Sequence, residues 1–360
     1  MHILSNQHPV PTAPGQSLKP GSWLVEDLVA AQIMGMAGGG EVHLRPFLRT
    51  PLEISDGQKL LIVRPGRFGD LICLTPVLRR IKHLFPKCQL HVATLPEYRD
   101  PLLGLPYIDG FLNYPIPLEE TDAFENVICL EALVSVMEDE KKVNITDLFA
   151  KRVGLDPTTM PNKQPDMFLS MEELTWAADS YPRKKDRKRV AFHVRSSTRS
   201  RDYPHENMNA LMVQLHSKGH EIAFLGLPHQ FKWATDKKPP GIYFCPEDKL
   251  TFRQSCAVLS TCDAFFGPDS AMIHAAAALN VPSVGVFATV PWQLRTAYYP
   301  KCHAIQGKQP CPIAPCFSAA MSNNPHAFPL DGPCSKSGQC DALHGIAPDR
   351  VMAKLEEILA

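Results

Sequence analysis

The sequence has no excess of charge of either sign. Its 37 Lys and Arg residues balance 37 Asp and Glu residues, so the formal net charge at pH 7 is zero. A neutral chain has no global field that attracts nucleic acid or an anionic membrane. It also has no apolar run near the roughly 18 residues that a membrane-spanning helix needs, and its first residues lack the charged and apolar segments of a signal peptide. These absences predict a cytoplasmic protein.

Motifs of several enzyme classes are missing as well. The chain has no G-x-S-x-G turn and no H-E-x-x-H helix, which argues against the common hydrolases. The glycines of MGMAGGGE (34–41) do not fit G-x-G-x-x-G, so we expect a loop there and no nucleotide site.

The 11 cysteines include no C-x2-C pair, the spacing typical of zinc sites. Six lie in segments with strand or helix patterns, where buried free thiols are common: Cys73, Cys88, Cys129, Cys245, Cys256 and Cys262. The other five lie close together near the C-terminus: Cys302, Cys311, Cys316, Cys334 and Cys340. For these five we expect free thiols, with structural zinc or disulfides as the alternatives, and no catalytic role.

From residue 59 onward, short apolar runs alternate with segments of helical spacing, which predicts βαβ units and parallel sheets. A first set of expected strands lies at 60–63, 89–94 and 124–130. A second set lies at 190–194, 221–226, 263–267 and 283–287, with helices at 205–219, 252–262 and 272–280. Two such sets predict two Rossmann-like domains, with ligands at the carboxyl ends of the strands.

The charge run YPRKKDRKR (181–189) separates the two sets. A solvated linker between domains is the interpretation that we prefer, and an anion-binding patch is the alternative. The expected division is a partly irregular N-terminal extension with one short helix near 25–34, two Rossmann-like domains, and a cysteine-rich region with an amphipathic C-terminal helix: 1–58, 59–182, 183–300 and 301–360.

The loop RPGRFGD (64–70) follows the first expected strand. Gly66 and Gly69 permit a tight turn and a close backbone approach. Asp70 comes next, where its carboxylate can accept a proton from a substrate hydroxyl. The structural alternative is that Asp70 is only the N-cap of the following helix; a start at Thr75-Pro76 is a second possibility for that helix.

Two later loops also follow expected strands. In FFGPDSAMIHAAAAL (265–279), the helix start suits a diphosphate, Ser270 adds a hydroxyl donor, and Asp269 suits sugar hydroxyls. His274 in this helix is more often packed than catalytic. In HVRSSTRSRDYP (193–204), hydroxyl and guanidinium groups form a mixture that binds phosphate, with a solvated surface loop as the alternative.

Taken together and in this order, RFGDLICLTPVLRRIKHLFP and LSTCDAFFGPDSAMIHAAAALNVPSVGVF resemble glycosyltransferase family 9, the ADP-heptose:lipopolysaccharide heptosyltransferases. That family reads G-D-x-x-x-x-x-P near its start and approximately D-S-G-x-x-H-x-A-A-A-L-x-x-P later. The resemblance covers about residues 59–300.

The resemblance implies an α/β protein of GT-B type, in which two Rossmann-like parallel-sheet domains face a cleft. It implies an inverting, metal-independent transfer with Asp70 as the base, and the absence of D-x-D agrees with metal independence. We expect no cofactor beyond an ADP-linked sugar as co-substrate. The implied acceptor-side loop contains Gly66, Arg67 and Gly69, and the implied donor-binding residues are Ser196, Ser197, Thr198, Arg201, Asp269, Ser270 and His274.

The sequence departs from the family pattern in several places. Ala271 replaces the glycine after Asp-Ser, and Arg201 stands where the family often has lysine. These differences leave the acceptor open: a glycan or lipopolysaccharide core first, another acceptor such as a modified DNA base second, and a non-catalytic scaffold of the same fold third. The neutral chain argues against nucleic acid. A glycolipid acceptor implies peripheral contact with the inner membrane.

Overall fold

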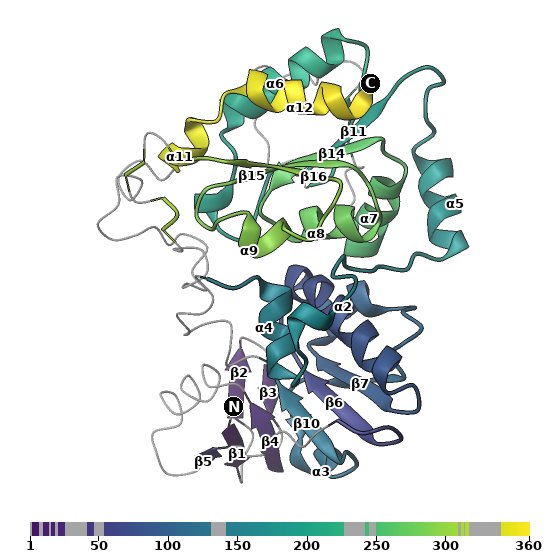
Figure 1. Cartoon of the computed structure of the whole chain (residues 1–360), viewed down its shortest axis with the longest axis vertical. Coiled ribbons are helices and arrows are strands. Elements are labelled where there is room, and N and C mark those ends of the chain that lie inside the picture. The colour runs from purple at the N-terminus through teal and green to yellow at the C-terminus, as the bar shows by residue number, and fades with distance from the viewer. Residues whose placement is uncertain are drawn as a thin grey trace. The chain divides into compact units, whose positions relative to one another are not determined.

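The structure is a computed structural model that describes residues 2–6, 10–13, 16–18, 21–25, 42–46, 54–130, 142–226, 242–244, 250–308, 311–312, 314–316 and 340–360. The chain divides into two compact units (Figure 1). The first is formed within Met1–Arg99, Leu105–Glu138 and Thr146–Asn162. The second is formed within Asp100–Gly104, Asp139–Ile145 and Lys163–Ala360.

A four-stranded parallel sheet forms the centre of the first unit, in the order β10-β6-β7-β8. Its strands are β6 (Lys59–Val63), β7 (Gln89–Thr94), β8 (Gly110–Asn113) and β10 (Asn126–Cys129). The helical segments of this unit are α2 (Phe68–Leu84), η1 (Pro96–Tyr98), α3 (Leu118–Thr121), α4 (Ile145–Arg152) and η5 (Pro157–Thr159). Leu61, Val63 and Ala93 are fully buried in one core cluster, as the continuous apolar runs of these strands require.

Helix α2 begins earlier than either start that we predicted for it. Its N-cap is Arg67, and Pro76 lies in its interior. A proline there removes one helix N–H and so deprives the carbonyl oxygen of Ile72 of its usual donor. The Thr75 hydroxyl donates to that oxygen over 2.8 Å. The Thr75 hydroxyl thus replaces the hydrogen bond that Pro76 removes inside the helix. Both predicted starts of this helix, at Asp70 and at Thr75, are wrong.

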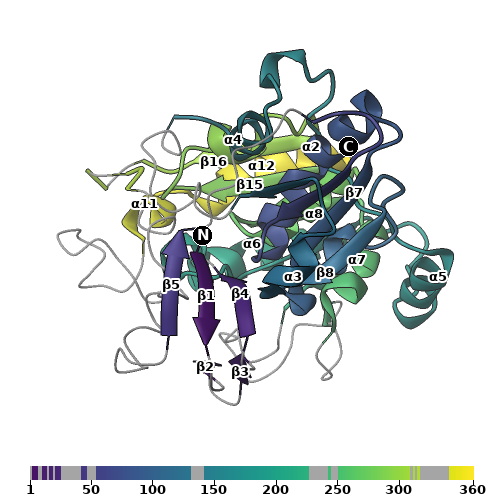
Figure 2. The ribbon, with the colours of Figure 1, turned by 90° about the horizontal axis from the view of Figure 1, so that it is seen from below.

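A second, antiparallel sheet in the first unit has the strand order β5-β1-β4-β9 (Figure 2). Its strands are β1 (His2–Asn6), β4 (Gly21–Val25), β5 (Val42–Pro46) and β9 (Ile116–Pro117); β2 (Val10–Ala13) and β3 (Gln16–Leu18) pair separately. Leu4 and Val25 are buried on one face of this sheet, and Ile116 is buried on the other. The segment that we expected to be partly irregular thus contains strands. The helix expected near 25–34 falls, beyond Val25, outside the described residues.

The second unit contains a six-stranded parallel sheet in the order β13-β12-β11-β14-β15-β16. Its strands are β11 (Arg189–Phe192), β12 (Glu221–Phe224), β13 (Ile242–Phe244), β14 (Ala264–Pro268), β15 (Ser283–Phe287) and β16 (Cys302–Gln306). In chain order this is 3-2-1-4-5-6, the order of dinucleotide-binding Rossmann sheets. The helical segments are η2 (Asp100–Leu102), α5 (Met171–Ser180), η6 (Arg199–Arg201), α6 (His205–Ser217), α7 (Phe252–Ser260), α8 (Ala271–Ala278), α9 (Gln293–Thr296), α11 (Asp341–His344) and α12 (Pro348–Leu359).

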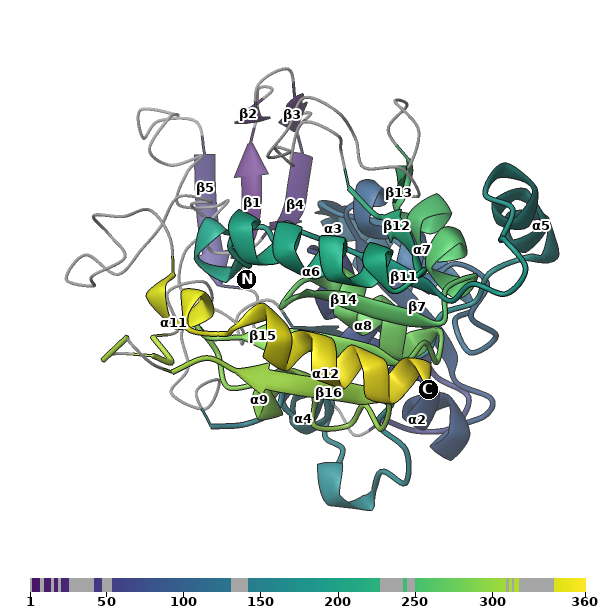
Figure 3. The same ribbon diagram turned by 90° about the horizontal axis from the view of Figure 1, so that it is seen from above.

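Helices cover both faces of this sheet. Figure 3 shows α6 and α12 running side by side across one face, where Leu211, Leu215 and Leu355 are fully buried in the main core cluster. Figure 1 shows α7, α8 and α9 on the opposite face. The amphipathic C-terminal helix predicted from the sequence therefore docks on the sheet of the second unit.

The charge run 181–189 lies within the second unit and joins α5 to β11. Residues 182–188 are exposed, but Arg189 is buried and pairs with buried Glu221 over 3.0 Å. Its guanidinium also donates to the carbonyl oxygens of Tyr181 and Pro182. The run is thus tied to the amino end of the sheet, within the continuous segment Lys163–Ala360 of the second unit.

Glu221→Gln should destabilise the fold strongly. The variant leaves the Arg189 cation buried without its charged partner, which typically costs roughly 3–5 kcal/mol. Urea unfolding of both proteins measures the difference. Lys354→Gln removes the exposed ion pair with Glu357 and serves as the control, with little expected change. Equal unfolding midpoints for Glu221→Gln and wild type would contradict this account of the pair.

Candidate functional site

The candidate residues gather at one point in each parallel sheet. The strand order reverses between β6 and β10 in the first unit and between β11 and β14 in the second. In open α/β sheets, ligands bind outside the carboxyl ends of strands at such switch points. Asp70 follows β6, the loop 193–204 follows β11, and Asp269 follows β14. The sequence prediction thus selected the switch point of both sheets.

Asp70 lies in the first turn of α2, where a carboxylate interacts favourably with the helix dipole. It accepts a hydrogen bond of 2.6 Å from Arg64, at the end of the preceding strand. The Arg64 side chain is 4% exposed and that of Asp70 is 26% exposed. Arg64 also lies 5.7 Å from the ring centroid of Phe149. A buried cation therefore fixes a carboxylate that solvent or a substrate can reach, and Asp70 is not the N-cap.

The other predicted residues of this loop are Gly66, Arg67 and Gly69. A Cβ atom at Gly66 would meet nothing within 4 Å, and its φ is not in the left-handed region. Backbone strain therefore does not require glycine there. Gly69 lies within the first turn of α2, and Arg67 is exposed. The role of these three residues on the acceptor side stays a prediction.

The loop after β11 is held by its own side chains. The Asp202 carboxylate accepts hydrogen bonds from the backbone N–H of Ser196, over 2.7 Å, and from Arg195, over 2.8 Å. Burial raises the pKa of Asp202, although the two hydrogen bonds and the charge of Arg195 oppose this shift. The Ser196 hydroxyl donates to the carbonyl oxygen of Thr198. The loop is thus folded in advance of any ligand.

Arg201 connects this loop to the strand beside it. Its guanidinium donates to the hydroxyls of Thr198, over 3.0 Å, and Ser197. It also lies 3.4 Å from the Asp269 carboxylate, which follows β14. The exposed fractions of the Arg201 and Asp269 side chains are 17% and 6%. Arg201 therefore links two other predicted donor-binding residues of its own loop to Asp269 on the neighbouring loop.

The pKa of Asp269 reflects two opposed effects. Burial alone would raise it, but the charges of Arg201, Arg295 and His274 and the hydrogen bond from Arg201 hold it below its usual value. Asp269 is therefore anionic at neutral pH. Arg295, on α9 beyond β15, is a second cation at this site. The two guanidinium groups and the one carboxylate leave an excess of positive charge. The sequence prediction did not include Arg295, which belongs to none of the recognised motifs.

Ser270 is the N-cap of helix α8, and His274 lies within that helix. The Ser270 hydroxyl lies 3.1 Å from Nδ1 of His193, a residue at the end of β11 that the sequence prediction also missed. His274 is buried, and its Nδ1 lies 2.6 Å from the Tyr299 hydroxyl. This packed arrangement is the structural alternative that we gave for His274. Its contact with a donor stays a prediction.

The cysteines do not form a recognisable metal centre in the described part of the chain. Among those residues, no group of three or more His, Cys, Asp or Glu side chains could hold a metal ion. Cys311 and Cys340 are buried in the same core cluster, whereas burial raises the pKa of Cys302 in β16 to about 11. Cys334 and Cys245 lie outside the described residues. Cys88, Cys256 and Cys262 are buried free thiols, as we predicted.

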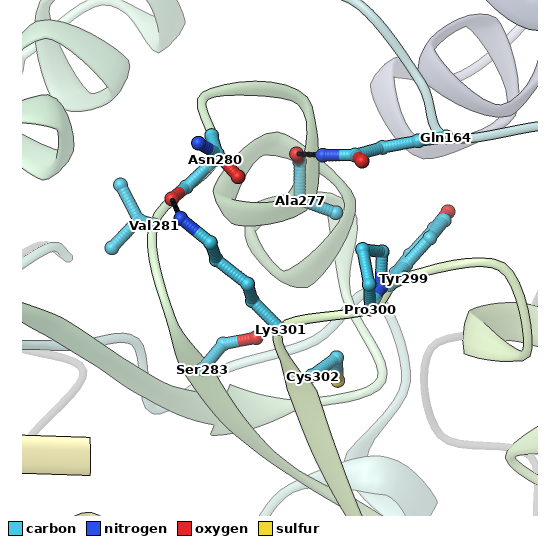
Figure 4. Close-up of a pocket in the computed structure, with 9 residues that line it drawn as sticks. All are labelled: Gln164, Ala277, Asn280, Val281, Ser283, Tyr299, Pro300, Lys301 and Cys302. Atoms are coloured by element: carbon cyan, nitrogen blue, oxygen red, sulfur yellow. Dashed lines mark hydrogen bonds between the residues drawn. The ribbon is translucent and has the colours of Figure 1, made fainter. Parts of the chain in front are cut away.

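A small hollow lies at the amino ends of β15 and β16, on the edge of the sheet opposite to the candidate site (Figure 4). Two of its polar side chains bond within the protein: Gln164 Nε2 donates to the Ala277 carbonyl oxygen over 2.8 Å, and Lys301 Nζ donates to the Asn280 carbonyl oxygen over 3.4 Å. We assign no ligand to this hollow.

Two parallel α/β sheets, each with candidate residues at its switch point, are the architecture expected of a GT-B type protein. The model of glycosyltransferase family 9 (heptosyltransferase) matches residues 139–326, just over half of the chain, and the chain belongs to this family. It is therefore an enzyme of glycosyl transfer, and the resemblance and fold class predicted from the sequence are confirmed. The matched segment includes Arg201 and Asp269 but not Asp70.

Individual relatives are distant. The chain is 23% identical over 292 residues to lipopolysaccharide heptosyltransferase 1 of Campylobacter coli, covering 65% of this chain and 84% of the relative. The solved structure of E. coli ADP-heptose lps heptosyltransferase II matches with a TM-score of 0.62 at 16% identity, covering 84% of this chain and 98% of that one. The dodecameric iron-containing heptosyltransferase TibC, in complex with ADP-D-beta-D-heptose, matches with a TM-score of 0.61 at 14% identity, covering 99% and 91%.

No described helix combines the length and the apolar character that crossing a lipid bilayer demands.

Proposed function

We propose that this enzyme transfers a heptose from an ADP-linked donor to a hydroxyl group of a glycan or lipopolysaccharide-core acceptor, with inversion and without a metal ion. The observation that carries the donor site is the Arg201–Asp269 pair at the switch point of the second sheet. With Arg295 it has an excess of positive charge, which suits the phosphates of a nucleotide sugar. Heptose and ADP are proposed because the C. coli relative is named a heptosyltransferase and TibC was solved with ADP-heptose.

The donor would be held by groups that are already in place. Arg201 is oriented by two hydroxyls and one carboxylate, so little side-chain entropy is lost when phosphate binds. The backbone N–H groups at the start of α8 would bind a second phosphate oxygen. Asp269 would accept hydrogen bonds from hydroxyls of the sugar or ribose while it keeps Arg201 in position. Guanidinium groups would thus take the part that a metal ion has in other transferases.

In the proposed reaction, Asp70 accepts the proton of the acceptor hydroxyl while the oxygen bonds to the anomeric carbon. The bond between that carbon and the diphosphate oxygen breaks, and the diphosphate leaves with the electron pair. Attack from the face opposite to the leaving group inverts the anomeric centre. Arg64 would orient the Asp70 carboxylate, and Arg201 would stabilise the charge that develops on the diphosphate.

The acceptor is the least constrained part of the proposal. The relatives favour a lipopolysaccharide core, and such an acceptor would bring the enzyme to a membrane surface. A different hydroxyl acceptor, including a modified DNA base, would use the same donor site. The charged runs 183–189 and 195–201 support DNA, and the zero net charge argues against it.

A thermal-shift panel of ADP-, UDP-, GDP- and CMP-linked sugars tests the donor site. We expect ADP-heptose at about 100 times its Kd to raise the Tm of the wild type by roughly 5 °C, because the ligand binds only the folded state. Asp269→Asn should lose most of this shift, since it removes the charge that orients Arg201.

Asp263→Asn is the matched control for this panel. Asp263 directly precedes the same strand, β14, and also pairs with an arginine, Arg183, but at the opposite end of the strand. Its variant should be less stable and should keep the full ligand-induced shift. Equal shifts in Asp269→Asn and wild type would contradict the donor site, and so would a wild type that no nucleotide sugar stabilises.

A further inference from the structure

The hydroxyl of Ser270 points away from the helix that it precedes. Serine is among the most favourable N-cap residues because its hydroxyl can accept a hydrogen bond from an N–H of the first helical turn. Ser270 is the N-cap of α8, yet its side chain makes no capping hydrogen bond. It lies instead 3.1 Å from His193 Nδ1 and is buried. The contact with His193 therefore replaces the capping hydrogen bond that the Ser270 hydroxyl could make.

His193 is held firmly at the end of β11. Its backbone N–H donates to the carbonyl oxygen of Phe266 over 3.0 Å, which extends the pairing of β11 with β14. Gly267 permits this close approach: a Cβ atom there would lie 3.2 Å from the carbonyl oxygen of His193 and 2.6 Å from the Phe265 ring. Burial lowers the pKa of His193 to about 4. The ring is therefore neutral at neutral pH and adds no charge to the site.

The Ser270 hydroxyl and a phosphate oxygen of the donor can both accept a hydrogen bond from the first turn of α8. By helix geometry, the N–H groups of Ala271 and Met272 have no partner inside the helix. The N–H of Met272 can bond to the Ser270 hydroxyl, and both N–H groups can bond to an oxygen of a bound phosphate, so a capping hydroxyl occupies a donor that a phosphate could use. A serine that caps the helix would thus compete with the donor, whereas a serine held by His193 would not.

We propose that His193 is a positioning residue for the donor: it holds the Ser270 hydroxyl off the first turn of α8 and so keeps the backbone N–H groups of that turn open to the diphosphate. This inference rests on the proposed function. It names the first residue of the 193–204 loop, which was not among the predicted donor-binding residues, and its effect on the donor acts through Ser270.

His193→Leu tests the proposal with ADP as the probe. We expect the Kd of ADP and the KM of ADP-heptose to rise about tenfold, with kcat little changed, because one set of phosphate contacts is lost. The Tm should stay equal or rise, since Ser270 becomes free to cap α8. His193→Asn keeps a hydrogen-bonding atom near the position of Nδ1 and should restore ADP affinity. A lower Tm with unchanged ADP affinity would instead indicate a purely structural residue and overturn the proposal.

The double variant His193→Leu/Ser270→Ala tests whether His193 affects ADP binding through Ser270. Alanine cannot cap the helix, so the double variant should bind ADP as well as Ser270→Ala alone does. If the double variant binds ADP more weakly than Ser270→Ala by the same factor that His193→Leu shows alone, His193 acts by another route and the proposal is overturned. If Arg201→Gln weakens ADP binding while His193→Leu does not, the donor site stands and this inference fails. If the wild type does not bind ADP, both fail.

Discussion

Asp70→Asn should lower kcat by about 10²–10⁴-fold, the usual contribution of a positioned general base, and should leave the KM of the donor nearly unchanged. Asparagine has the size of aspartate and can still accept a hydrogen bond from Arg64, but it cannot take a proton from an acceptor hydroxyl. Steady-state assays with ADP-heptose and a lipopolysaccharide-core acceptor measure both constants. Full activity of Asp70→Asn would show that the base lies elsewhere.

The buried position of Arg64 complicates this variant. Arg64 is 4% exposed at the side chain, so loss of the Asp70 charge should lower the free energy of unfolding by roughly 1–3 kcal/mol. Arg64→Met/Asp70→Asn removes both charges and should recover stability while it stays inactive. Asp109→Asn is the matched control: Asp109 pairs with Lys82 in the same unit over 2.6 Å, and its variant should lose stability but keep kcat. Activity that returned with stability in the double variant would assign Asp70 a structural role only.

The elements that the sequence predicted well are the buried ones. The strands expected at 89–94 and 283–287 have the bounds of β7 and β15. All five residues of β15 are buried, as is typical of a parallel strand covered on both faces, and four of the six residues of β7 are buried. In the two parallel sheets, the strands that were missed are edge strands: β8, β13 and β16. β16 has mixed exposure and reads CHAIQ, and β8 has no buried residue. Partial burial removes the signal on which the sequence prediction depends.

Helix α5 was missed although the sequence contains a signal for it. Ser170 and Glu173 form a capping box, in which each side chain bonds to the backbone of the other residue. The pattern S-x-x-E before Leu174 and Trp176 is a recognised helix start. The charge run that follows, 181–189, favoured a linker instead. A local capping pattern was the better guide here than composition.

For the site, sequence patterns predicted residue types but not the partners of those residues. Arg201 and Asp269 were each predicted to bind the donor, but nothing in the sequence indicates that they pair across 68 positions. Arg64 and His193 were missed for the same reason, since their roles depend on where two strand ends direct their side chains. Strand order brings such residues together, and strand order is a property of tertiary packing rather than of local pattern.

Arg201→Gln should reduce kcat/KM by about 10²–10³-fold, as the loss of one oriented donor to developing charge does in other enzymes. Glutamine keeps hydrogen-bonding groups near Thr198 and Asp269 but removes the positive charge. Arg201→Lys keeps that charge and should retain most of the activity, although it cannot bond to two hydroxyls and a carboxylate at once. Arg199→Gln is the control, because Arg199 is an exposed arginine of the same loop.

The same variant should change the pH dependence of donor binding. Burial favours protonation of Asp269, and the charge of Arg201 is the largest effect that opposes it. Without that charge the pKa of Asp269 rises, so the Gln variant should lose ADP affinity at a higher pH than the wild type as the solution is acidified. Calorimetric titration of ADP across an acidic pH series measures this shift, and in Arg201→Gln/Asp269→Asn it should disappear. Parallel pH profiles for wild type and Arg201→Gln would show that Arg201 does not control the charge of Asp269.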